Sequence, residues 1–184
     1  MTAELLVRRA KAIASGVKTL YVRGGFGQPL VSANKIRLLL GFAENRVPER
    51  TRRIWAADPN TFAFDCSGLI KGILWGWTGD SGDPCGGAVC PSNGVPDLRA
   101  DDLIAVCRNV SEDFSNLVPG EVVWLREHIG IYIGEGLVVE SSPLGAYGVQ
   151  QTACGIDRPG YLRRDWEKHG KLPYVTYDVR GAVR

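Results

Sequence analysis

The chain has 184 residues, of which 45% are hydrophobic and 23% charged, a composition typical of a folded globular domain and not of a disordered segment. Its formal charge of +2 is too small to indicate nucleic acid as a partner, although weak attraction to an anionic polymer such as a cell wall remains compatible with it. No uninterrupted run of about 18 apolar residues is present, so we expect no insertion into a membrane.

The N-terminal segment predicts an amphipathic helix. Leu6, Ala10, Ile13 and Val17 recur at the spacing of one helical face. A secretory signal would place its positive charges before an apolar stretch, whereas the arginines here alternate with apolar residues. We therefore expect the protein to be made in a cytoplasm without a signal peptide and to reach any external target by another route.

Residues 26–60 are interpreted mainly as an insertion loop. Glycines at 24, 25 and 27 indicate a turn, and Ser32 could cap a helix over NKIRLLLGFAEN. The arginine-rich stretch 46–60 shows no apolar period. A second loop, rich in glycine and proline, is expected over 78–97.

The remaining pattern predicts an α+β fold with the helices first. Asp65 stands at an N-cap position before the apolar run CSGLIKGILWGW, and RADDLIAVC indicates another short helix. From residue 119 onward, the β-branched runs EVVWL, HIGIYIG, LVVES, GVQQTA and YVTY predict a mostly antiparallel sheet of about five strands. We expect residues 1–184 to form a single catalytic domain, with no wall-binding domain visible.

Among the five cysteines, Cys66 is the best candidate for a nucleophile. It lies at the predicted start of a buried helix, where unpaired backbone N–H groups and the helix dipole lower a thiol pKa and can hold an oxyanion. Small Ser67 and the following glycine leave room for a substrate carbonyl. Cys85 and Cys90 are close enough in sequence to bridge under oxidising conditions, but no second ligand pair supports a metal site, and no cofactor is expected.

Of the two histidines, His128 is the better candidate for a base because it opens a strand, whereas His169 lies in the polar stretch WEKHGK, where we expect it to titrate in solvent. A three-residue loop of Gly134 to Gly136 would pair Gly130 with Glu140 and place His128 and Glu140 on one face of the sheet. A two-residue loop would place them on opposite faces. On the first geometry, Glu140 can orient the imidazole and stabilise its charge.

These residues resemble the NlpC-type papain-like cysteine peptidases of bacterial cell-wall turnover. The resemblance rests on YVRGG (21–25), FDCSGLI (64–70) and PGEVVWLREHIGIYIGEGLVVES (119–141). It implies a papain-like fold with the nucleophile at a helix start, Cys66 as nucleophile and His128 as base. It further implies Tyr21 beside the oxyanion and Asp65 as a ligand for a substrate amine, with Ser67 in the same substrate region.

The chain departs from the family pattern at two points. Glu140 occupies a position where the family usually has histidine, sometimes Asn or Gln. About 38 residues separate Gly25 from Phe64, a longer connection than usual. That insertion, with Arg46, Arg50, Arg52 and Arg53, either reshapes the cleft and contacts an acidic polymer or is a solvated basic loop.

The resemblance implies hydrolysis of an amide bond in peptidoglycan stem peptides, with D-glutamyl–diamino acid endopeptidase activity as the first hypothesis. The chain also resembles phage and prophage endolysin catalytic domains, which act on the wall after release from the bacterial cytoplasm. The alternatives are an N-acetylmuramoyl-L-alanine amidase, an acyltransferase on the same fold, and an inactive wall-binding or tail-structural protein. The oligomeric state is left open.

Overall fold

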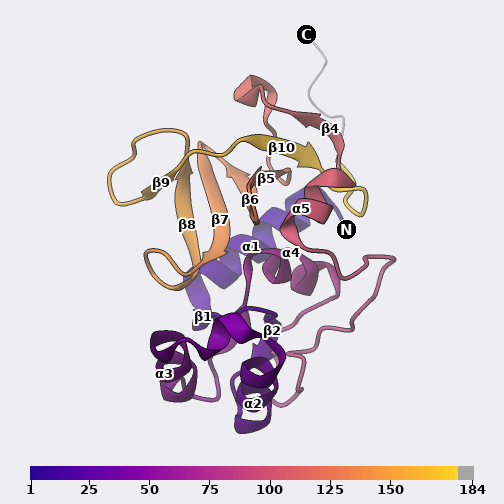
Figure 1. Cartoon of the computed structure of the whole chain (residues 1–184). Coiled ribbons are helices and arrows are strands. Elements are labelled where there is room, and N and C mark those ends of the chain that lie inside the picture. Colours follow the sequence, from indigo (N-terminus) through magenta and orange to yellow (C-terminus); the bar gives the residue numbers. More distant parts are fainter. Residues whose placement is uncertain (178–184) are drawn as a thin grey trace.

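The computed structural model describes residues 1–177 and has the α+β architecture that the sequence predicts (Figure 1). The helices are α1 (Ala3–Gly16), α2 (Ser32–Gly41), α3 (Pro48–Ala56), α4 (Cys66–Leu74) and α5 (Ala100–Ala105), with short 3-10 helices η1 (Ala43–Arg46) and η2 (Phe114–Asn116). The strands are β1 (Thr19–Tyr21), β2 (Phe26–Pro29), β3 (Phe62–Phe64), β4 (Arg108–Ser111), β5 (Val122–Leu125), β6 (His128–Gly134), β7 (Leu137–Ser142), β8 (Gly148–Cys154), β9 (Leu162–Arg164) and β10 (Lys168–Lys171).

The larger sheet has seven strands in the order β4-β10-β5-β6-β7-β8-β9 and is antiparallel except for the pair β8–β9. The four central predicted strands, β5 to β8, are confirmed. The fifth was wrong: of the predicted strand YVTY, only Thr176 makes an isolated bridge, to Thr2. The strand beside β5 is instead β10, whose sequence KHGK shows no apolar alternation: its backbone pairs with β4 and β5, and the side chain that it buries is that of His169.

A second, three-stranded sheet in the order β1-β3-β2 was not predicted. The glycine-rich stretch after Arg23 turns and then forms β2, antiparallel to β3. Glycine is required there for close pairing, since a Cβ on Gly25 would lie 2.7 Å from the backbone carbon of Ala63. The glycines that suggested a loop therefore allow two backbones to approach.

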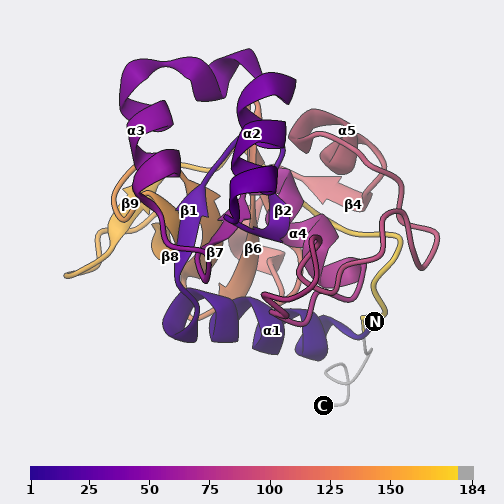
Figure 2. The ribbon, with the colours of Figure 1, turned by 90° about the horizontal axis from the view of Figure 1, so that it is seen from below.

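Helix α4 packs against α1, β2, β6 and β7, and every one of its residues is buried. It thus lies between the small sheet and the large one, as Figures 1 and 2 show. Leu69 and Ile70 of α4 join Leu6 of α1 and Ile129 and Ile131 of β6 in the main core, all 0% exposed. Burial of each such side chain contributes about 1.5–3 kcal/mol, so the start of α4 is fixed firmly against β6.

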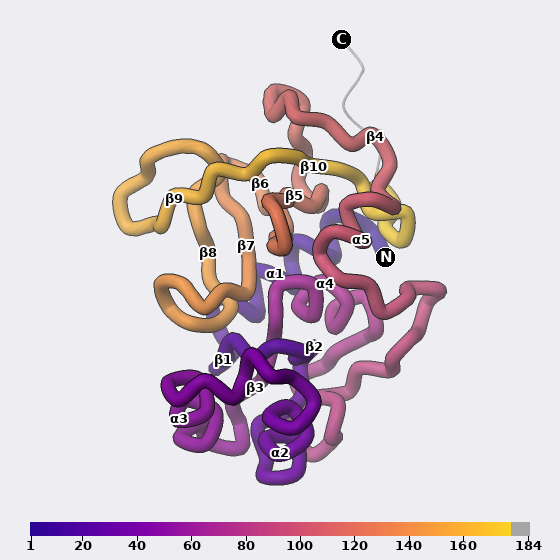
Figure 3. Tube along the Cα trace, in the orientation of Figure 1, coloured from indigo at the N-terminus to yellow at the C-terminus, as the bar shows by residue number. Residues whose placement is uncertain are grey.

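The insertion 26–60 is largely helical and not a loop. Helix α2 confirms the predicted helix, although Val31 and not Ser32 occupies its N-cap. The arginine-rich stretch forms α3, which begins at Pro48 and buries Ile54 completely. One buried side chain leaves no visible apolar period, which is why the helix was missed. Both helices lie at the end of the molecule away from β10 (Figure 3).

The predicted loop 78–97 is confirmed, since this stretch contains neither helix nor strand. Trp75 donates its indole N–H to the carbonyl of Val95 in this loop at 2.9 Å, and Trp77, directly before the loop, donates to the carbonyl of Gly27 in β2 at 2.7 Å. Among residues 1–177, no helix is both long and apolar enough to cross a bilayer.

Candidate active site

Cys66 is the first residue of α4, as the sequence predicts. Asp65 caps the helix: its Oδ1 accepts from the N–H of Gly68 at 2.6 Å, and its Oδ2 accepts from that of Gly24 at 2.8 Å. The cap thereby joins the helix start to the segment 21–25. Contact there is tight, because a Cβ on Gly68 would lie 1.8 Å from the carbonyl oxygen of Gly25.

His128 opens β6 directly after a tight β5–β6 turn. Leu125 and His128 are paired across the hairpin, so two residues form the turn, and the second, Glu127, has a left-handed φ of 62°. Asp101 of α5 accepts from the Glu127 N–H at 2.9 Å and fixes this conformation. The Glu127 carbonyl in turn lies 3.9 Å from the sulfur of Cys66.

The side chains of His128 and Glu140 meet, and the imidazole Nε2 bonds to Oε2 of the carboxylate. The predicted register holds at the site, since Ile131 pairs with Val139. The turn itself differs: Gly134 pairs with Leu137, leaving a two-residue loop, and an irregularity at Ile133 restores the register. The bulge therefore places His128 and Glu140 on one face despite the shorter loop.

Glu140 is fully buried and has two further partners that sequence reasoning missed. Thr152 of β8 donates its hydroxyl to Oε1 at 2.7 Å, and Nε of Arg164 lies 3.3 Å from the same oxygen. Thr152 could have been found from the β7–β8 hairpin, where Glu140 pairs with Gln150 two positions away. Nothing in the sequence LRRDW indicates that Arg164 turns inward.

Trp166 covers one face of the His128 ring, with centroids 5.6 Å apart and planes 11° from parallel. This indole was also missed. An aromatic face against the imidazole, together with the bond to Glu140, fixes both the position and the plane of the ring.

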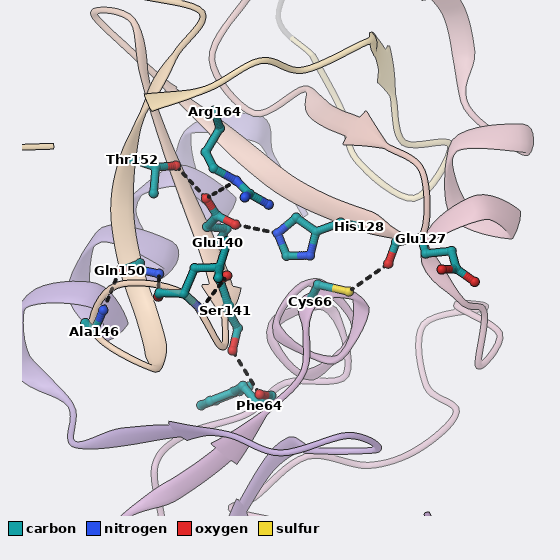
Figure 4. A network of polar contacts seen from close by, with 12 residues as sticks. Phe64, Cys66, Glu127, His128, Glu140, Ser141, Ala146, Gln150, Thr152 and Arg164 are labelled. Carbon is teal, nitrogen blue, oxygen red and sulfur yellow. Dashed lines mark hydrogen bonds and ion pairs between the residues drawn. The ribbon is translucent and has the colours of Figure 1, made fainter. Parts of the chain in front are cut away.

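Figure 4 shows the His128 ring between the carboxylate of Glu140 and the sulfur of Cys66. An ionised carboxylate only accepts, so the hydrogen of the His128–Glu140 bond belongs to Nε2. Nδ1 is then free to take a proton. The three candidates from α4, β6 and β7 therefore lie in one region, with His128 bonded to Glu140 and the Cys66 sulfur 3.9 Å from the carbonyl oxygen that precedes His128.

The charge state of Cys66 differs from the expectation. Its residue is 2% exposed, and this burial, with the nearby Asp65 carboxylate, raises the pKa of the thiol to about 12. Backbone N–H groups of Ser67 and Ile129 and the Arg23 guanidinium lower the pKa, but burial outweighs them. The predicted lowered pKa is wrong for the unliganded protein: desolvation exceeds the effect of the helix start.

The remaining predicted site residues are Tyr21, Asp65 and Ser67, and each makes different contacts near Cys66. Tyr21 is 7% exposed, and burial and the neighbouring Cys66 and Asp65 raise the pKa of its phenol. Both carboxylate oxygens of Asp65 accept backbone bonds, and the hydroxyl of Ser67 donates to Oδ1 at 3.2 Å. Ser67 and Asp65 therefore bond each other at the helix start, a geometry that favours positioning of Cys66 over direct contact with substrate.

His169 is not solvated, contrary to the sequence interpretation. It is 3% exposed, its Nδ1 bonds to Oε2 of Glu121, and its Nε2 lies 2.9 Å from the carbonyl oxygen of Asp113. Both ring nitrogens are occupied, and no cysteine sulfur is among their partners. This pair joins β10 to the segment before β5. All five cysteines are free thiols in the structure, including Cys85 and Cys90.

Comparison with known proteins finds no matching family model and no matching curated protein. The solved structures that are similar to the chain include two of low sequence identity. One is NlpC2 from Trichomonas vaginalis, at 14% identity and a TM-score of 0.46, covering 92% of this chain and 46% of that one. The other is the P60 domain of the antigen MAP1204 from M. avium subspecies paratuberculosis, at 17% identity and a TM-score of 0.47, covering 92% and 93%. The chain thus spans less than half the length of the first protein and nearly all of the second.

Proposed function

We propose that the protein is a cysteine peptidase or amidase that cleaves an amide bond in peptidoglycan stem peptides. The observation that carries the proposal is the alignment of Cys66, His128 and Glu140, with His128 bonded to a fully buried carboxylate. The substrate class is supported by the motifs around Cys66 and His128, which resemble those of cell-wall peptidases. No cofactor is required, because thiol and imidazole perform both steps.

The chemistry begins with a neutral thiol. Nδ1 of His128 takes the proton of Cys66 as the sulfur attacks the substrate carbonyl, and Glu140 stabilises the imidazolium that forms. The N–H groups of Cys66 and Ser67, at the start of α4, lack partners within the helix and can donate to the developing oxyanion, whereas that of Gly68 is bonded to Asp65. His128 then returns the proton to the leaving amine, and a thioester remains on Cys66.

The thioester is resolved by water, with His128 as the base that activates it. The product is a free carboxylic acid, and the thiol recovers its proton from His128. We propose the D-glutamyl–diamino acid bond as the site of cleavage, in an endolysin-like enzyme that is made in the bacterial cytoplasm and acts on the wall after release.

Acyl transfer is a second candidate, favoured by the burial of Cys66, which is 2% exposed. A site from which water is excluded allows an amine to compete with water for the thioester. Transfer and hydrolysis differ only in the second acceptor. Adding a small primary amine to the reaction separates them, since transfer yields a product heavier by the amine, whereas hydrolysis yields the free acid.

The proposal is tested by mass spectrometry of fragments released from purified peptidoglycan by the wild type and by Cys66→Ala. Cys107→Ala is the matched control, because it removes a half-buried thiol whose hydrogen bond is to the carbonyl of Leu103 and not to a residue of the proposed site. New peptide termini released by the wild type and the control, but not by Cys66→Ala, identify the bond. Absence of release from walls with different diamino acids would contradict a peptidoglycan hydrolase, and failure to thin walls from outside would contradict the endolysin proposal.

A further inference from the structure

The insertion is fastened to the chain segment that adjoins Cys66. The side chain of Asn45 is 0% exposed, accepts from the N–H of Arg23 at 3.0 Å and donates to the carbonyl of the same residue at 2.9 Å. The segment continues to Gly24, whose N–H bonds to the Asp65 carboxylate at 2.8 Å. A rigid connection therefore runs from the insertion to the residue that precedes Cys66.

Arg50 of α3 is held over the aromatic side of this segment. Its guanidinium carbon lies 5.4 Å from the centre of the Tyr21 ring, and its Nε donates to the hydroxyl of Tyr147 at 3.3 Å. Arg53, one turn later, stacks on Tyr147 at 4.2 Å. Figures 1 and 3 show α3 below the β7–β8 loop that carries Tyr147. Tyr21 in turn is paired with Phe64, two residues before Cys66.

The guanidinium of Arg50 is only partly used by the protein. Besides Tyr147, it donates through Nη1 to the carbonyl of Glu44 at 3.2 Å. Within residues 1–177 no carboxylate lies at ion-pair distance from Arg50, and none of its nitrogens is among the buried groups that lack a partner. Nη2 has no hydrogen bond within residues 1–177 and is not fully buried. A guanidinium with an unused N–H donor can bind a carboxylate.

A second cation, Arg23, lies on the same side. Burial lowers the pKa of its guanidinium, but the Asp65 carboxylate and, less strongly, that of Glu44 raise this pKa. Among the described residues Glu44 is the acidic group at ion-pair distance, with Nε and Oε1 3.9 Å apart and the Glu44 side chain 56% exposed. Such a pair is weak and exchangeable. Two guanidinium groups thus act on Tyr21 beside the nucleophile. Arg23 shares its charge with Asp65, whereas Arg50 has no carboxylate at ion-pair distance within residues 1–177.

We propose that Arg50 and Arg23 form a carboxylate-binding subsite next to Cys66, which selects substrates with a free carboxylate near the scissile amide. The inference rests on the proposed function for its substrate, an acidic peptide, but the subsite can be tested without that substrate. Its specific claim is that the helical insertion supplies a substrate-binding residue to the site.

The test compares alkylation of Cys66 by iodoacetate and by iodoacetamide, which differ in carrying a carboxylate or a neutral amide. The same thiolate attacks the methylene carbon of either reagent and displaces iodide, so the pKa of Cys66 cancels from the ratio of the two rates. We expect this ratio at Cys66 to exceed that of the model thiol N-acetylcysteinamide by about tenfold, the scale of one charge-assisted hydrogen bond. Labelling is followed by mass spectrometry of the peptide that contains Cys66.

Arg50→Gln should bring the ratio close to that of the model thiol. Arg50→Lys keeps the charge but loses the paired N–H donors of the guanidinium, and it should give an intermediate value. Arg52→Gln is the matched control: it removes the same charge from an exposed position of the same helix and should keep the wild-type ratio. Equal ratios in the wild type and Arg50→Gln, an equal loss in Arg52→Gln, or failure of iodoacetate to label Cys66 would overturn the subsite.

A matched pair of stem peptides, one with a free carboxylate beside the cleaved bond and one with a primary amide there, separates this inference from the proposed function. Cleavage of both peptides at equal kcat/KM would overturn the subsite and leave the peptidase standing. Cleavage of neither, with an iodoacetate preference that depends on Arg50, would contradict the peptidase and support the subsite.

Discussion

Replacing Glu140 by Gln tests the centre of the proposed mechanism. The substitution keeps the shape of the side chain but removes its charge, at a position that is 0% exposed. An amide can turn its NH2 toward His128, which would force the hydrogen onto Nδ1, on the side that must accept the proton of Cys66. It also removes the only charge that compensates a protonated His128 from within the sheet.

The size of the effect follows from the contacts of the carboxylate. Glu140 accepts from His128 and Thr152, and Nε of Arg164, whose side chain is 15% exposed, lies 3.3 Å from it. Hydrogen bonds to charged groups contribute about 1.5–3 kcal/mol each, and Gln can replace some of them. We expect the free energy of unfolding to fall by about 2–4 kcal/mol, partly because Arg164 loses its counterion. For a chain of this size the Tm should fall by about 5–15 °C.

The effect on catalysis should be larger than the effect on stability. A base held in the wrong tautomer loses about 10²–10⁴ in kcat. The assay is steady-state cleavage of a stem peptide below the Tm of the variant, with circular dichroism to confirm folding. Thr152→Val is the control, because it removes one bond to the same oxygen but keeps the charge; we expect a loss of about 1–2 kcal/mol and less than tenfold in kcat. A folded Glu140→Gln with kcat within threefold of wild type would refute the orienting role.

Three further outcomes are expected. The alkylation rate of Cys66 by iodoacetamide should still rise with pH between 9 and 11. Burial raises the thiol pKa to about 12, so the reactive thiolate forms only as the pH approaches that value. A rate that reaches a plateau near pH 8.5 or below would instead indicate an ion pair with an imidazolium. Gly68→Ala should lower the free energy of unfolding, measured in urea, by about 3 kcal/mol, because the added Cβ would meet a backbone oxygen at 1.8 Å. Gly16→Ala, whose Cβ would meet nothing within 4 Å, should raise that free energy by about 0.5–1 kcal/mol. His169→Gln should lower the free energy of unfolding by about 3 kcal/mol, because it breaks the buried pair with Glu121, and should change kcat/KM less than threefold. Loss of activity in a folded variant would mean that His128 is not the only essential histidine.

The strands that carry the site were predictable because each has a strong pattern of its own. β5 to β8 are rich in β-branched residues, and glycines precede β5, lie in the β6–β7 turn and open β8. Asp65 before an apolar run marks the start of α4. The face shared by His128 and Glu140 was predicted through a three-residue loop, whereas the structure reaches the same register through a two-residue loop and a bulge at Ile133. A bulge has no sequence signature comparable to a turn, so the two solutions could not be distinguished.

What escaped prediction is held by contacts that are distant in the sequence. In the sequence, Arg164 and His169 stand in polar stretches typical of solvated residues. Only the assembled sheet shows that β9 places Arg164 against Glu140 and that β10 places His169 against Glu121. Helix α3 escaped for the opposite reason: it buries one apolar residue, Ile54, and two of its three arginines, Arg50 and Arg53, lie over tyrosine rings. A hydrophobic period cannot reveal a helix that packs in this way.

The burial of Cys66 also bears on the life of the protein before it is folded. The nucleophile is on α4, whereas the residues that close the site around it follow much later in the chain, on β6, β7 and β9. Such a high contact order predicts slow closure, and translation from Cys66 to Arg164 alone takes about 5–20 s. During that time the thiol is open to oxidants, but once the sheet forms it is 2% exposed and neutral, a state that resists conversion to sulfenic acid. Oxidative damage to the nucleophile should therefore fall mainly on nascent and unfolded chains.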